Sequence, residues 1–275
     1  IVLTYIPLIA VFGLSFFKWG GTGAPEWNGI NNYIKLFTTD PYFKESIKVT
    51  VYFSLLAVVG SMVYSLIVAM LLNRKIPARG FFRAVFYLPY VLPAAAVYIG
   101  WSWLYNTEWG LFNYILSKLG IERLMFVSSS SQVVPSLALI AVWLSGNLIV
   151  IFLAGLQNVP RVYHEAAEID GANAWQRFWH VTFPSMTPII FYNMLMSLIT
   201  NMQVVTPALA LTKGGPGKSS YFMSYMLYNY AFKQRGKIGL ACAIAFVLFL
   251  LIGAFTLLLF ATSKSWIFYE GGDDK

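Results

Sequence analysis

Residues 241–261 read ACAIAFVLFLLIGAFTLLLFA, an apolar run that contains no charged side chain. A helix needs about 20 apolar residues to cross the ~30 Å hydrocarbon core of a bilayer, so this run is long enough to span a membrane. A spanning β-barrel is excluded, because such runs are continuous and too long for alternating strands of ~10 residues. The stretch therefore predicts a transmembrane helix.

The rest of the chain has the same character, with 58% hydrophobic and 11% charged residues among 275. A soluble domain of this length carries roughly twice that charge and could not hide so much apolar surface from water. No polar or charged linker divides the chain. We therefore predict an all-α integral membrane protein with a single domain over residues 1–275. Six transmembrane helices are expected at about 1–18, 50–73, 82–105, 132–156, 186–211 and 239–262.

The chain begins at Ile1 rather than Met, and its first residues are already apolar. We expect that a preceding segment is missing. A cleaved signal peptide is not expected, because neither a basic n-region nor a small-residue cleavage site is visible.

The net charge of +8 comes from Lys and Arg residues that lie between the apolar runs. This placement favours a membrane-flanking role over binding to nucleic acid. Charge alone does not settle the orientation. The connections at 74–81, with its flanks, and at 212–238 are both basic and contain no acidic residue. A chain with six spans would nevertheless place these two connections on opposite faces of the membrane. The basic residues of the second connection are Lys213, Lys218, Lys233, Arg235 and Lys237.

The connection at 157–185 reads QNVPRVYHEAAEIDGANAWQRFWHVTFPS and predicts two short helices. Asn158 is a candidate cap for the first helix, and Pro160 lies near its first turn, where a missing N–H costs nothing. Gly171 is expected to turn the chain. A second amphipathic segment with an aromatic side follows, and Pro184 begins the next span.

Within this connection, Glu165-Ala166-Ala167, three residues, Gly171, nine residues and Val181-Thr182-Phe183-Pro184 form a spaced pattern. It resembles the signature E-A-A-x3-G-x9-I-x-L-P of membrane subunits of binding-protein-dependent ABC importers. The only departures are Val181 for Ile and Phe183 for Leu. Further pieces resemble the carbohydrate importers of the maltose and glycerol-phosphate group, and the resemblance covers about residues 1–265. These pieces are Phe82-Arg83, Leu88-Pro89-Tyr90, Pro93, Trp143-Leu144 and Leu211-Thr212-Lys213-Gly214-Gly215-Pro216.

The resemblance implies a MetI-like permease fold in a bacterial or archaeal cytoplasmic membrane, crossed several times by the chain. It implies four partners: a second permease subunit, two ATPase subunits and an external solute-binding protein. Connection 157–185 would be the cytoplasmic coupling loop, in which Glu165 pairs with a basic group of an ATPase and small residues allow close approach. Closure of the ATPases would then move the spans. The implied coupling residues are Glu165, Ala166, Ala167, Asp170, Gly171 and Pro184.

A carbohydrate path through the spans would be lined by aromatic rings and amide or hydroxyl groups. The candidates are Tyr90, Trp143, Ser145, Asn147, Ser197, Asn201 and Gln203, of which Tyr90, Ser197 and Asn201 fall on sugar-contacting positions by the resemblance. Such residues also join helices to one another in membranes. Pro89, Pro93 and Pro207 are expected to kink or unwind helices, as transporter sites often require.

No catalytic or metal-binding site is expected. Gly217-Lys218-Ser219 suggests a phosphate loop, but Thr212 occupies the position that requires glycine. ATP and Mg²⁺ are expected on the ATPase partners and no cofactor on this chain. His164 and His180, with one distant cysteine, suggest no metal site. Two alternatives remain: an ion-coupled secondary sugar carrier, disfavoured because every carboxylate lies outside the spans, and a membrane enzyme, for which no catalytic cluster is found.

Overall fold

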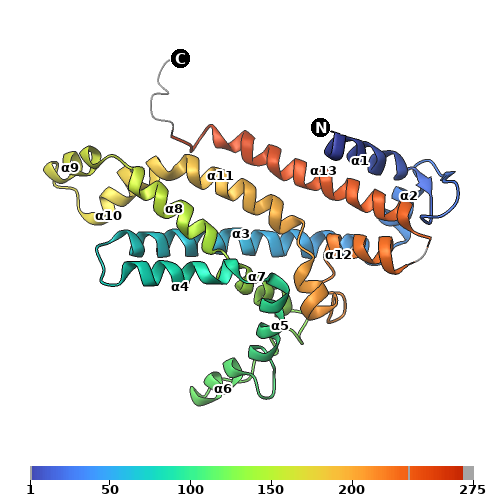
Figure 1. Ribbon diagram of the computed structural model, residues 1–275, viewed down its shortest axis with the longest axis horizontal. Coiled ribbons are helices and arrows are strands. Elements are labelled where there is room, and N and C mark those ends of the chain that lie inside the picture. Colours follow the sequence, from blue (N-terminus) through green and yellow to red (C-terminus); the bar gives the residue numbers. More distant parts are fainter. Residues whose placement is uncertain (1, 235, 269–275) are drawn as a thin grey trace. The chain divides into compact units, whose positions relative to one another are not determined.

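The computed structural model describes residues 2–234 and 236–268, and Arg235 of the basic connection lies outside them. Helices dominate the described structure (Figure 1), and a small antiparallel sheet pairs β1 (Phe17–Lys18) with β2 (Glu26–Trp27). The α-helices are α1 (Val2–Leu14), α2 (Asn31–Ile34), α3 (Phe43–Asn73), α4 (Arg79–Val91), α5 (Ala94–Leu104), α6 (Leu111–Lys118), α7 (Val133–Trp143), α8 (Gly146–Asn158), α9 (Arg161–Ile169), α10 (Ala174–Arg177), α11 (Phe183–Met202), α12 (Met223–Tyr228) and α13 (Ile238–Ser263). Short π-helical segments are η1 (Lys35–Thr39), η2 (Phe178–Thr182), η3 (Ala208–Thr212) and η4 (Asn229–Lys233).

The structure is mostly helical, as predicted, although the short sheet of β1 and β2 was not expected, and two predicted spans appear as continuous helices of membrane length. These are α3, with 31 residues, and α13, with 26. The pairs α4–α5 and α7–α8 are each apolar and long enough when taken together, but they bend by 100° and 50°. Helix α1 has 13 residues, and the helix in the fifth predicted span, α11, ends at Met202 rather than near residue 211. The count of six spans therefore stays a prediction.

Helix α4 ends before Pro93, in agreement with the kink that was predicted at this proline. Leu92 adopts an extended conformation with φ −69° and ψ 144°. The ring of a proline disfavours the helical conformation of the residue before it, so the chain leaves the helix at Leu92. Pro89, by contrast, lies inside α4 without ending it.

The break between α7 and α8 falls at Ser145 and was not predicted. Ser145 is buried, and its hydroxyl donates to the carbonyl of Val142 at 2.6 Å. The same hydroxyl lies 2.9 Å from that of Ser65 on α3. A side chain that bonds to the preceding turn competes with the helical hydrogen bonds, which explains the local break.

Contacts divide the chain into two compact units, each assembled from separate segments. Unit 1 comprises Ile1–Leu56, Ala94–Ala138 and Ile199–Phe255. Unit 2 comprises Ala57–Pro93, Leu139–Leu198 and Thr256–Lys275. Unit 1 thus contains the connections at 19–49, 106–131 and 212–238, whereas unit 2 contains those at 74–81 and 157–185.

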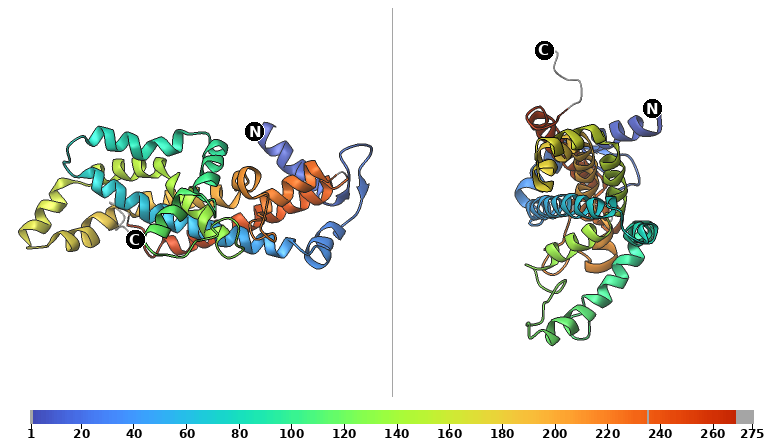
Figure 2. Two further views of the ribbon diagram at one scale, coloured as in Figure 1. Left: turned by 90° about the horizontal axis from the view of Figure 1, so that it is seen from below. Right: turned by 90° about the vertical axis from the view of Figure 1, so that its left-hand side faces the viewer.

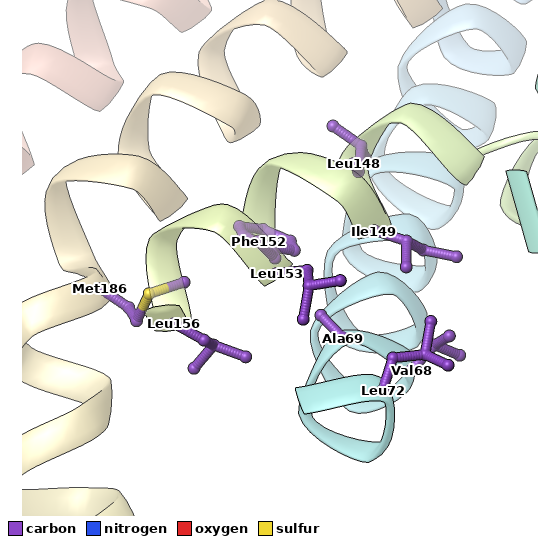
Figure 3. Close-up of a cluster of buried hydrophobic side chains, with 9 residues drawn as sticks. All are labelled: Val68, Ala69, Leu72, Leu148, Ile149, Phe152, Leu153, Leu156 and Met186. Atoms are coloured by element: carbon purple, nitrogen blue, oxygen red, sulfur yellow. The ribbon is translucent and has the colours of Figure 1, made fainter. Parts of the chain in front are cut away.

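The core of unit 2 is built around one face of α8 (Figure 3). Apolar residues on α8 recur at the spacing of a single helical face and pack against α3 and against the start of α11. The buried set is Val68, Ala69 and Leu72 of α3, Leu148, Ile149, Phe152, Leu153 and Leu156 of α8, and Met186 of α11. Lipid is as apolar as these side chains, so close packing rather than exclusion of water holds such helices together.

Two glycines let α8 approach its neighbours in unit 2 closely. A Cβ atom on Gly146 would lie 2.7 Å from the carbonyl oxygen of Phe86 on α4. A Cβ atom on Gly155 would lie 2.6 Å from the Cδ1 atom of Ile189 on α11. Small residues at such contacts are typical of helix packing in membranes.

The connections of unit 1 are tied down by buried polar side chains. The Asn32 amide donates to the carbonyls of Ser15 and Phe17 at 2.8 and 2.9 Å. Asn113, which is 2% exposed, donates to the Leu124 carbonyl and accepts from the Leu124 N–H, both at 2.9 Å. These bonds hold the connections in place by pairing backbone groups with buried side chains.

Candidate functional site

The segment at 157–185 forms a projecting loop that begins directly after α8. Asn158 is the last residue of α8, so its predicted role as a cap of the next helix is wrong. The following turn is extended at Pro160, with φ −59° and ψ 131°, and α9 starts at Arg161. Helix α8 continues to Asn158 because its apolar face still packs at Leu156. The predicted first short helix is confirmed as α9.

Gly171 turns the chain at the end of α9, as predicted. Its φ of +79° lies in the left-handed region, which only glycine adopts readily. The N–H groups of Asp170, Gly171 and Ala172 donate to carbonyls of the last turns of α9 at 2.9–3.0 Å. These bonds satisfy carbonyls that the end of a helix would leave free.

The second short helix, α10, begins with a reciprocal cap. The side chain of Asn173 accepts from the N–H groups of Trp175 and Gln176 at 3.0 and 2.9 Å. The Gln176 side chain accepts in return from the Asn173 N–H at 2.8 Å. An ion pair between Arg177 and Glu168 then joins α10 to α9.

No residue of α9 or α10 is buried, which sets this loop apart from the other elements of unit 2. Ile169 is 87% exposed, and Trp175 is 68% exposed. Figures 1 and 2 both show α9 and α10 beyond the ends of α8 and α11 at one end of unit 2. Glu165 is exposed on α9, and within the described residues it forms no ion pair. An exposed apolar surface of this kind marks a site of contact with a partner or a membrane.

A hollow of about 260 Å³ lies on this loop and contains three of the predicted coupling residues. Ala167, Asp170 and Gly171 are brought together there, whereas Glu165, Ala166 and Pro184 do not line it. The remaining lining residues are Ala172, Gln176, Arg177, His180 and Val181. Gln176, Arg177 and His180 were missed, because the lining comes from α9, α10 and η2 together and no spacing within one helix signals it.

The candidate residues for a carbohydrate path fall in both units. Tyr90 is 49% exposed on α4 of unit 2, and its ring centroid lies 5.7 Å from that of Tyr87. Trp143, Asn147 and Ser197 are half-buried in unit 2, whereas Asn201 and Gln203 belong to unit 1. Ser145 is buried and joins α3 to the α7–α8 break. The role of each residue in a substrate path stays a prediction.

Residues 61–265 match the family described as the binding-protein-dependent transport system inner membrane component. The chain belongs to this family. The permease is therefore a transport component rather than an enzyme, and the family resemblance seen in its motifs is confirmed.

Two bacterial relatives are 36% identical to the permease. One is a probable ABC transporter permease, YesP, of Bacillus subtilis (strain 168), matched over 98% of this chain and 88% of the relative. Another is the multiple sugar-binding transport system permease MsmF of Streptococcus mutans, matched over 97% and 91%. The trehalose/maltose transport system permease MalF of Thermococcus litoralis is 30% identical over 94% and 87% of the two chains.

A solved structure shares the fold. It is a crystal structure of a bacterial ABC transporter that imports the acidic polysaccharide alginate, with a TM-score of 0.81 over 96% of this chain and 90% of that one. The sequences are 20% identical. The likeness supports the permease fold predicted from the motifs.

Proposed function

We propose that this permease forms half of the translocation pore of an ATP-driven importer that admits a carbohydrate delivered by an external solute-binding protein. The observation that carries the proposal is the exposed loop at 157–185, in which the importer signature forms helix α9 and the left-handed turn at Gly171. An integral membrane subunit without its own nucleotide-binding loop needs such a projection to receive motion from an ATPase. A second permease subunit and two ATPase subunits complete the assembly.

The carbohydrate assignment rests on the relatives together with the candidate residues. MsmF and the Thermococcus MalF are named for sugar transport. A second structure with the same fold, at a TM-score of 0.79, holds a periplasmic protein bound to an alginate pentasaccharide. Exposed Tyr87 and Tyr90 on α4 offer aromatic rings, on which the faces of sugar rings stack.

The proposed topology has six spans, two of them bent, with the connections at 74–81 and 157–185 in the cytoplasm. The two units support this arrangement, because unit 2 contains both of these connections and unit 1 contains the other three. The basic connection at 212–238 is then external. Lys218 lies 4.4 Å from the ring centroid of Tyr221, and Lys237 lies 5.0 Å from that of Tyr230. Cation–π contacts of this kind give these lysines a structural role within unit 1.

The test is to compare ATP hydrolysis with uptake of radiolabelled oligosaccharides in proteoliposomes that contain the assembled transporter and its binding protein. Substituting Glu165→Gln or Gly171→Ala should lower uptake by about tenfold while hydrolysis continues, because coupling between sites is typically worth 5- to 150-fold. Glu122→Gln, an exposed carboxylate of unit 1, is the matched control and should leave uptake unchanged. Wild-type uptake in both loop variants would refute the coupling role. Uptake driven by an ion gradient without any ATPase would establish the secondary-carrier alternative instead.

A further inference from the structure

The loop at 157–185 joins α11 through a stretch that contains two prolines four residues apart, Pro184 and Pro188. In a regular helix the carbonyl of residue 184 would accept from the N–H of residue 188. Proline has no N–H, and its ring crowds the carbonyl four residues earlier. The first turns of α11 therefore lack one backbone hydrogen bond, and a junction of this kind bends more easily than a continuous helix.

Thr187 supplies a replacement for this bond from its side chain. The residue is 2% exposed, and its hydroxyl donates to the Pro184 carbonyl at 2.7 Å. The same oxygen accepts from the backbone N–H of Phe268, 81 residues further along the chain, at 2.9 Å. A hydroxyl can donate one bond and accept others at the same time. Thr187 therefore joins the proline junction to the segment that follows α13.

The segment Trp266–Phe268 lies against α11 after α13 has ended at Ser263. The N–H groups of Trp266 and Ile267 both donate to the Ser263 carbonyl, at 3.2 and 3.0 Å, which turns the chain out of the helix. The ring centroid of Trp266 lies 6.0 Å from that of Phe191 on α11, with the ring planes at 63°. Edge-to-face pairs of this kind are favourable. Figures 1 and 2 show the segment beside the start of α11, at the end of unit 2 that carries α9 and α10.

Phe268 lies beside both ends of the loop that carries α9 and α10. A hollow of about 220 Å³ is lined by Phe268 and by residues from both ends of this loop. They include Val159 and Pro160, where the chain leaves α8, and Ser185 and Pro188, at the start of α11. Because Phe268 is 54% exposed, its attachment depends on its backbone hydrogen bond, and such a segment can detach without unfolding of the core.

We propose that Trp266–Phe268 is an internal strap that stiffens the proline junction, and that Thr187 is the positioning residue that ties the strap to this junction. The inference rests on the proposed function, in which a displacement of α9 and α10 by an ATPase must pass through the junction to reach α11. A junction that bends absorbs the displacement. A junction held by the Thr187 hydroxyl passes the displacement on to the span, so the strap sets how much transport each hydrolysis event produces.

The test is the number of ATP molecules hydrolysed per radiolabelled oligosaccharide taken up, in proteoliposomes that contain the whole transporter and its binding protein. Thr187→Val keeps the branched shape but removes the hydroxyl, so this ratio should rise about fivefold, the size expected for loss of one hydrogen bond. Thr187→Ser keeps the hydroxyl and should restore the wild-type ratio. The matched control, Thr262→Val, removes a hydroxyl that bonds to carbonyls of its own helix, α13, and should leave the ratio unchanged.

A purely structural role for Thr187 predicts a different result. A variant that is only less stable loses hydrolysis and uptake together, so the ratio between them stays at the wild-type value. A wild-type ratio in Thr187→Val would therefore overturn the strap, as would a raised ratio that Thr187→Ser fails to restore.

Hydrogen exchange separates failure of the strap from failure of the proposed importer function. In the assembled transporter, amides at 186–192 should exchange about fivefold faster in Thr187→Val than in the wild type, whether or not any oligosaccharide is taken up. Unchanged exchange would refute the strap, whereas a wild-type assembly without ATP-driven uptake would refute the importer function. If Thr187→Val does not assemble, Trp266→Ala releases the strap from the ring of Phe191 and should give the same faster exchange; wild-type exchange in that variant would overturn the proposal.

Discussion

The connections of unit 1 and the long connection of unit 2 are stabilised in different ways. In unit 1, Asn32, Asn113 and Thr50 are buried and bond to backbone groups outside their own helices. The Thr50 hydroxyl, for example, accepts from the Met223 N–H at 2.9 Å. In unit 2, α9 and α10 have no buried residue and are joined by caps and one exposed ion pair. Segments with few buried contacts open most easily, so the loop that is proposed to move is also the one that is least constrained.

The largest difference in stability between the connections of unit 1 and the loop of unit 2 is expected from Asn113→Ala. The substitution leaves the backbone N–H and carbonyl of Leu124 without partners in a site where Asn113 is 2% exposed. Each hydrogen bond is worth about 0.5–1.5 kcal/mol, and the buried side chain is also lost, so unit 1 should be destabilised by about 2–3 kcal/mol. Thermal unfolding of the purified protein measures the loss. An unchanged melting temperature would show that unit 1 does not depend on its buried polar ties.

A somewhat smaller effect is expected at the contact between α8 and α4. Gly146→Ala places a Cβ atom 2.7 Å from the Phe86 carbonyl oxygen and should cost about 1–3 kcal/mol, as overpacking in cores does. The matched control is Gly253→Ala on α13, where nothing lies within 4 Å of the added atom. Equal melting temperatures for the two variants would contradict the close contact.

Asn173→Ala should act locally within the loop of unit 2. Loss of the cap of α10 is worth about 1 kcal/mol, but the segment is exposed and its opening does not require the core of unit 2 to unfold. We expect faster hydrogen exchange across 173–182 with an unchanged melting temperature. A melting temperature lowered as far as in the Asn113 variant would remove the contrast between the two regions.

The smallest effect is expected at Tyr230 in the connection 212–238. Burial, together with the hydrogen bond to Asp40, raises the pKa of the Tyr230 hydroxyl above its ordinary value. The neutral hydroxyl therefore contributes stability below about pH 10, the pKa of an unfolded tyrosine, and this contribution is lost as the pH rises above it. Tyr230→Phe should lower stability by about 1 kcal/mol at neutral pH. A thermal-melting series from pH 8 to pH 11 should show a shallower alkaline decline in the variant; parallel curves would contradict the assignment.

The positions of the long apolar helices were predictable from the sequence. The exact helix ends and the breaks within spans were predictable only where a single residue determines the backbone conformation. Helix α13 matches its predicted span to within one residue at each end. Helix α3 begins at Phe43, seven residues before the predicted start, because the Asp40 carboxylate accepts from the N–H groups of Tyr42 and Phe43 and the first turns are charged. Hydropathy detects only the part of a helix that faces lipid.

The candidate site also contains features that the sequence predicts and features that it does not. The turn at Gly171 and the extended residue before Pro93 follow from the preferences of glycine and proline and could be read from the sequence. The break at Ser145 could not, because serine also occurs within continuous membrane helices and the second partner of its hydroxyl, Ser65, lies 80 residues away in the chain. The hollow beside Gly171 was missed for a similar reason, since three short elements form it together.

The 13 residues of α8 form a rod about 20 Å long between the loop at 157–185 and the break at Ser145. Under the proposed coupling, a displacement of α9 would be carried along α8 to its other end, where Gly146 packs against Phe86 of α4. A Cβ atom on Gly146 would lie 3.0 Å from the Cα atom of Tyr87, one turn from Tyr90. Under the proposed coupling, movement driven by an ATPase would therefore reach the part of α4 that carries Tyr87 and Tyr90.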